Sequence, residues 1–148
     1  MRILLAIDNS PHSDAAAKSV QDRPWPTDSA VRVLSVVQTS FLSAGSNAGE
    51  GILNYRELTE SFVKEAQELV DLTAVKLEIL GLSIDARVRQ GDPRKEILDE
   101  AEDWRADLIV VGSHGQTGVQ RWLVGSVAEH VVRHAPCSVE VVRRRSLS

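Results

Sequence analysis

The chain has 148 residues, of which 43% are hydrophobic and 26% are charged, and this balance is typical of one globular domain over residues 1–148. A formal net charge of −4 argues against non-specific binding to nucleic acid. The first apolar run stops at Asp8, too short for a secretion signal or a membrane span, and the lone cysteine, Cys137, favours a reducing compartment. We therefore expect a cytoplasmic protein that binds neither nucleic acid nor a membrane.

Segments with strand-like and helix-like patterns alternate along the whole chain. The first strand is apolar on both faces, which is typical of a parallel strand covered by helices. Ser10-Pro11 and Asp92-Pro93 are helix-start signals, and Gly81 is a helix-stop signal. The predicted strands span residues 3–7, 31–37, 83–89, 107–111 and 139–143, and the predicted helices span residues 11–23, 55–80, 93–104 and 126–134.

Between the second strand and the longest helix, residues 39–53 have little hydrophobic pattern and predict a mobile loop. The helix that follows has apolar residues at helical spacing, which predicts one buried face. That stripe consists of Leu58, Phe62, Ala66, Leu69, Leu72 and Leu80.

This alternation predicts an α/β fold with a parallel sheet, right-handed crossovers and helices on both faces. Ligands of such sheets lie beyond the carboxyl ends of the strands, where the strand order reverses. If the first strand is central and the fourth is its neighbour, their exit loops, residues 8–11 and 112–115, meet in one crevice.

The segment GSHGQTGVQRWLVGS, residues 112–126, leaves the fourth strand through several glycines and opens the last helix. Glycine allows a ligand close to the backbone, and free N–H groups at a helix start bind phosphate, so this segment predicts a nucleotide site. Purely structural alternatives remain open at this stage. Ser126 and Glu129 have capping-box spacing, Gly112 suits a plain turn, and His114 alone suits a surface loop. No metal-ligand spacing surrounds His114.

The spacing of Gly112, Gly115 and, nine residues later, Gly125-Ser126 resembles the ATP-binding pattern of the universal stress protein family. ILLAIDNSPHSDAA, VRVLSVVQ, GDPRKEIL and GSVAEHVVRHAPCSVEVV resemble other blocks of that family in the same order. The phosphate-loop, dinucleotide-binding and serine-hydrolase motifs are absent from the sequence. The resemblance covers nearly the whole chain.

The resemblance implies an open five-stranded sheet in the order 3-2-1-4-5, of the Rossmann-like type found in adenine nucleotide alpha hydrolases. Its crevice would hold ATP, with Mg or Mn bound through the phosphates. Asp8 would contact the ribose or adenine, Ala6, Ile7 and Val36 would line the base pocket, and Val111 and Gly112 would flank the adenosine. The phosphates would meet Ser113, His114, Gly115, Gly125, Ser126 and Val127.

Three functions follow as hypotheses. The first is an ATP-binding stress protein that acts as a nucleotide-dependent regulator or sensor, with an unidentified downstream protein partner. The second is a slow ATPase or autophosphorylating protein, although no catalytic residue and no protein ligand for a metal can be assigned. The third is an interaction protein that binds no nucleotide. The resemblance also implies a homodimer through the fifth strand, which two facing copies of Glu140 would weaken by repulsion.

Overall fold

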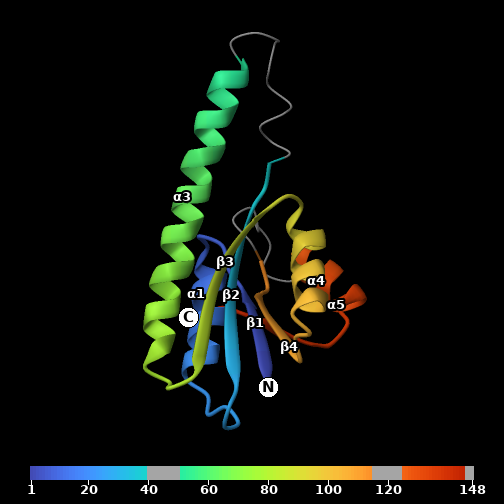
Figure 1. Ribbon diagram of the computed structural model, residues 1–148. Helices are drawn as coiled ribbons and strands as arrows, with labels where there is room; N and C mark the ends of the chain where they lie inside the picture. Colours follow the sequence, from blue (N-terminus) through green and yellow to red (C-terminus); the bar gives the residue numbers. More distant parts are fainter. Residues whose placement is uncertain (40–50, 115–124, 146–148) are drawn as a thin grey trace.

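The computed structural model describes residues 1–39, 51–114 and 125–145, and it contains a five-stranded parallel sheet in the order β3-β2-β1-β4-β5 (Figure 1). The predicted fold class and strand order are therefore confirmed. The strands are β1 (Arg2–Ala6), β2 (Ala30–Val37), β3 (Ser83–Gln90), β4 (Leu108–Gly112) and β5 (Ser138–Val142). The helices are α1 (Pro11–Gln21), α3 (Gly51–Glu78), α4 (Pro93–Asp103) and α5 (Ser126–His134).

Helices cover both faces of the sheet, with α1 and α3 on one side and α4 and α5 on the other (Figure 1). Side chains alternate between the two faces along β1, so Ile3 and Leu5 pack toward α1 and α3 while Leu4 packs toward α4 and α5. All three are fully buried, as expected for a central strand of a doubly covered sheet. The two hydrophobic clusters fix β1 and β4 side by side in the middle of the molecule.

Two helix starts follow their sequence signals. Ser10 is the N-cap of α1, its side chain accepts a hydrogen bond from the Ser13 N–H, and Pro11 occupies the first turn. Asp92 caps α4 in the same way through the Arg94 N–H. Each cap supplies an acceptor for an N–H group that the helix itself leaves unpaired. At the other end of α3, Gly81 has a φ of +68°, a conformation that favours glycine.

Helix α3 departs from its sequence prediction at both its start and its buried face. It begins at Gly51, so residues 51–53 are helical and not part of a loop, and residues 40–50 of the predicted loop lie outside the described residues. Leu58, Phe62 and Leu72 are 48%, 43% and 56% exposed. Ala66 of the predicted stripe is buried, and Leu69 and Leu80 are partly buried against the core. Val70, Thr73 and Leu77 complete the buried face. The predicted stripe is therefore confirmed only in part. The amino end of α3 continues past the end of the sheet (Figure 1), and Leu72 lies off the face that Val70, Thr73 and Leu77 bury.

Strand β5 lies at one edge of the sheet, and Glu140 in it does not face outward along that edge. Its carboxylate accepts a hydrogen bond of 2.9 Å from the Ser19 hydroxyl of α1. The Glu140 side chain therefore points to the face of the sheet that α1 covers, and pairing of β5 with its own copy stays a prediction. No helix in the described part of the chain is long and apolar enough to cross a membrane.

Candidate functional site

The carboxyl ends of β1 and β4 lie next to each other, as the sequence predicted. Ala6, the last residue of β1, is paired with Leu34 of β2 on one side and with Val111 of β4 on the other. The Ile7 N–H continues the sheet for one more residue by donating to the Leu34 carbonyl at 2.8 Å. Ala6, Ile7 and Val111 are all buried, so their backbones form the floor of the crevice.

Ser113 joins three elements at this crevice through its backbone. Its N–H donates to the carbonyl of Val142 at the end of β5, at 2.8 Å. Its carbonyl accepts from the N–H of Gly125 at 2.6 Å, immediately before α5. The exit of β4 and the amino end of α5 are therefore held together, and Gly112, Ser113, His114 and Gly125 form one cluster.

The amino end of α5 has no side-chain cap. Gly125 is the N-cap residue, and its carbonyl accepts from the Glu129 N–H at 2.9 Å. The capping box considered for Ser126 and Glu129 is therefore wrong, because Ser126 is already the first helical residue and its side chain is exposed. The N–H groups of the first turn, which include those of Ser126 and Val127, are left to an external acceptor such as a phosphate.

Asp8 is fixed at the end of β1 by Ser13 of α1. The Asp8 N–H donates to the Ser13 hydroxyl oxygen, and the Ser13 hydroxyl donates to Asp8 Oδ1, both at 2.8 Å. Ser13 was not singled out in the sequence. A serine five residues after the strand-end aspartate was the available signal, since helix starts commonly carry such side-chain contacts to the preceding turn.

Gly112 is a glycine for a reason that the sequence did not reveal. A Cβ atom at this position would lie 2.8 Å from both the carbonyl carbon and the carbonyl oxygen of His12. The first turn of α1 therefore packs directly on the end of β4. Gly125 has a φ of −60° and a ψ of 155°, which any residue adopts, so its glycine is not required by backbone conformation.

Two histidines meet over Ser113. The Ser113 hydroxyl lies 3.2 Å from Nδ1 of His12 and 3.0 Å from Nδ1 of His114, and the two imidazole rings are 5.0 Å apart between centroids. Burial and the neighbouring His114 lower the pKa of His12, Arg144 lowers it further, and Asp8 opposes them. Nε2 of His114 is buried and has no hydrogen-bond partner among the described residues. This orphaned polar atom fits a site that receives a polar ligand.

The remaining predicted residues lie as follows. Val36 and Val127 are partly buried and pack on the same side of the sheet as Ala6 and Val111, so one apolar wall contains all four. Gly115 lies outside the described residues. The sequence thus indicated the elements that converge here, but not the contributions of His12 and Ser13 on α1.

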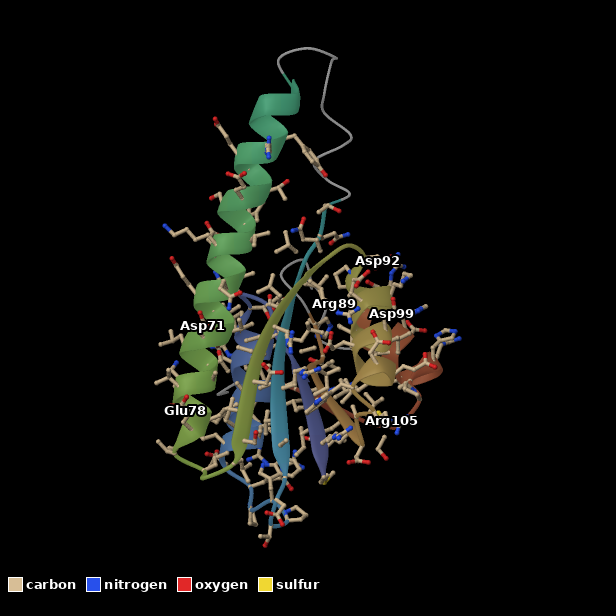
Figure 2. All side chains as sticks on the ribbon, in the orientation of Figure 1. Asp71, Glu78, Arg89, Asp92, Asp99 and Arg105 are labelled. Carbon is tan, nitrogen blue, oxygen red and sulfur yellow. The ribbon has the colours of Figure 1, made fainter. Side chains whose placement is uncertain are left out.

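A second concave region lies elsewhere, between β2, β3 and α4. This pocket of about 370 Å³ includes Arg32, Arg89 and Glu100 in its lining. Arg32 Nη1 lies 2.7 Å from Glu100 Oε1, Glu100 Oε2 also pairs with Arg89, and Arg89 reaches Asp103 at 3.0 Å. Figure 2 shows Arg89 between β3 and α4. Because these charges satisfy one another, we interpret this region as a structural ion-pair network and not as the ligand site.

Other chemistries receive little support in the described ranges 1–39, 51–114 and 125–145. No group of three or more His, Cys, Asp or Glu side chains there could hold a metal ion. Burial raises the pKa of the Cys137 thiol, so little of it is present as the reactive thiolate at neutral pH. The crevice at Ser113 remains the site with convergent polar groups.

Comparison with known proteins points to one family. The model of the universal stress protein family matches residues 1–143. A universal stress protein of Methanocaldococcus jannaschii is 35% identical over 144 residues, which cover 97% of this chain and 82% of that protein. A putative universal stress protein of Staphylococcus epidermidis is 30% identical over 98% of this chain and 85% of its own length.

Solved structures give the same result at the level of the fold. The M. jannaschii protein MJ0577 matches with a TM-score of 0.86 at 28% identity, covering 98% of this chain and 96% of its own. A universal stress protein family protein of Arabidopsis thaliana, solved with AMP bound, matches with a TM-score of 0.66 at 18% identity, covering 99% and 93%. A universal stress protein in complex with cAMP matches with a TM-score of 0.66 at 20% identity, covering 96% of each chain.

Proposed function

Because the chain belongs to the universal stress protein family, we propose that it binds ATP in the crevice between β1 and β4 and acts as a nucleotide-dependent regulator in the cytoplasm. The observation that carries this proposal is the hydrogen bond from the Gly125 N–H to the Ser113 carbonyl. It places the uncapped start of α5, a ready anion site, directly beside the exit of the central strands.

Different residues of the crevice would contact the adenine, the ribose and the phosphates of the nucleotide. Ala6, Val36 and Val111 offer an apolar wall for the adenine, and the Asp8 carboxylate, oriented by Ser13, is an acceptor for ribose hydroxyls. The phosphates would lie against Ser113, His114 and the amino end of α5. A Mg or Mn ion would be bound through the phosphates and would balance their charge. The AMP and cAMP found in the two related structures support an adenine nucleotide as the ligand.

Mass spectrometry of the purified protein tests the proposal most directly, because a bound nucleotide would be carried through purification. Calorimetric titration with Mg·ATP should then show binding by the native protein and a loss of about tenfold or more in Gly125→Val, whose branched side chain would stand before the helix amides. Gly81→Ala, at the far end of α3, is the control and should bind normally. An undiminished affinity in Gly125→Val would refute the phosphate assignment.

We further propose that the protein senses bound ATP and does not rapidly hydrolyse it. Phosphoryl transfer requires a group that orients the attacking water in line with the leaving group. His114 is hydrogen-bonded to Ser113 through Nδ1, which suits a phosphate contact better than water activation. Phosphate release in excess Mg·ATP, followed over hours, should therefore stay near a single turnover. Steady multiple turnover that is lost in His114→Ala would instead make the protein an ATPase.

A further inference from the structure

We propose that His12 and His114, joined through the Ser113 hydroxyl, form a proton-coupled phosphate-binding pair, so that the protein takes up a proton when it binds the phosphates of its nucleotide. This inference rests on the proposed function, and it adds a ligand-binding residue, His12, and a regulation by pH. It starts from the two contacts of 3.2 Å and 3.0 Å that bring both Nδ1 atoms to one hydroxyl.

Hydrogen counting at Ser113 sets the protonation of the empty site. A serine hydroxyl has one hydrogen, so it can donate to only one of the two Nδ1 atoms. At least one Nδ1 must therefore carry a hydrogen and donate to the Ser113 oxygen, whose two lone pairs can accept from both rings. When both rings are neutral, at least one Nε2 therefore lacks a hydrogen. A phosphate group that meets both rings thus finds at least one acceptor nitrogen, and that nitrogen must gain a proton before it can bind an anion.

The charges around His12 keep that proton away while the site is empty. Burial lowers the pKa of His12, and so do His114, at the end of β4, and Arg144, which follows β5. Only Asp8, at the end of β1, acts in the opposite direction. An incoming phosphate brings negative charge to the same place, so it offsets the repulsion between the two rings and Arg144 and raises the pKa of His12.

Position supports a direct contact with phosphate. His12 lies in the first turn of α1, and its backbone packs against Gly112 where β4 ends. Ser113, which holds both rings, also accepts the Gly125 N–H before α5. The imidazole pair therefore stands at the junction of the two features assigned to phosphate, and the buried Nε2 of His114 has no other partner in the described part of the chain.

The sign of the pH dependence follows from linkage. Since binding raises the pKa of His12, affinity for phosphate-bearing ligands is highest at low pH and falls as the pH rises through the pKa of the bound form. A rise of one pKa unit on binding corresponds to an affinity change of about tenfold. The phosphates of ATP also titrate at about pH 6. The pH dependence of affinity must therefore be compared between variants and not judged on the native protein alone.

The experiment is calorimetric titration of Mg·ATP at about pH 5.5 and about pH 8 in buffers of different ionisation enthalpy, which reports the protons taken up. The native protein should lose about tenfold more affinity over this range than His12→Gln, with a correspondingly larger proton uptake. Adenosine, which lacks phosphate, should bind the native protein with little pH dependence. His134→Gln, on the exposed end of α5, is the matched control and should behave as native.

A readout independent of affinity is the NMR titration of the histidine rings with and without nucleotide. The pKa of His12 should rise on addition of Mg·ATP and stay unchanged with adenosine. ATP binding with equal pH dependence in native protein and His12→Gln, or an unmoved His12 pKa, would overturn this inference and leave the proposed function standing. Absence of ATP and adenosine binding at every pH would overturn both.

Discussion

Arg23 at the end of α1 forms an ion pair of 2.7 Å with Glu140 of β5, across the face of the sheet. With the Ser19 hydroxyl, it satisfies both oxygens of a carboxylate that stands in an otherwise apolar edge strand. Both charged side chains are partly exposed, so the pair itself contributes less than about 1 kcal/mol to stability. Its main effect is to remove a negative charge from the edge of β5.

We therefore predict a homodimer in which two β5 strands pair across a two-fold axis, since an uncovered strand edge rich in valine is prone to such pairing. Light scattering over a concentration series should show the dimer. Glu140→Gln should dimerise as the native chain does, and acidification should not strengthen the dimer. A purely monomeric protein would refute the predicted pairing, and a tighter dimer in Glu140→Gln would show that Glu140 opposes it.

Gly112→Ala should destabilise the fold by about 1–3 kcal/mol, because the new methyl group would displace the first turn of α1 from β4. The same displacement would move His12 and weaken Mg·ATP binding. Chemical denaturation and calorimetric titration measure the two effects. Gly81→Ala is a useful comparison, since its Cβ would meet nothing within 4 Å and only its φ of +68° is strained. It should lose about 1 kcal/mol of stability and keep its affinity.

Ser126→Ala distinguishes two roles of the Ser126 hydroxyl, contact with the ligand and capping of α5. Ser126 is exposed and does not cap α5, so its removal should change the free energy of unfolding by less than about 0.5 kcal/mol. Binding of Mg·ATP should nevertheless weaken if the hydroxyl meets a phosphate. A variant that loses stability while its affinity stays native would contradict this assignment.

Glu100→Gln should cost about 3 kcal/mol of stability, because it leaves Arg32 and Arg89 facing a neutral group at a buried position. The Glu100 side chain is only 6% exposed, and it joins α4 to two strands. Glu102→Gln, exposed on the same helix, is the matched control and should be near neutral. A small loss in Glu100→Gln would mean that the two arginines find other partners.

The sequence predicted those features that depend on neighbouring residues. Continuous apolar runs located β1 and β4, and the Ser10-Pro11 and Asp92-Pro93 pairs located two helix starts. Convergence of the exits of β1 and β4 followed from the topology rules of parallel sheets. These signals are local or common to the fold, so they can be read without coordinates.

Contacts between residues far apart in the chain could not be predicted in this way. His12 and Ser113 are 101 positions apart, and Arg32 and Glu100 are 68 apart. The sequence predicted a strand over residues 83–89, but not which helix would pair with its charged side chains. The buried face of α3 was predicted only in part, because hydrophobic periodicity reveals the pattern of a helix and not the length of the sheet beneath it.

The length of α3 has a consequence for local unfolding in solution. None of residues 55–65 is buried, whereas Ala66, Val70 and Leu77 are held against the sheet. Helical hydrogen bonds without tertiary packing are only marginally stable in water. Amide hydrogens in the first half of this one helix should therefore exchange with solvent orders of magnitude faster than those in its second half. We therefore expect the two halves of this continuous ribbon in Figure 1 to differ in local stability.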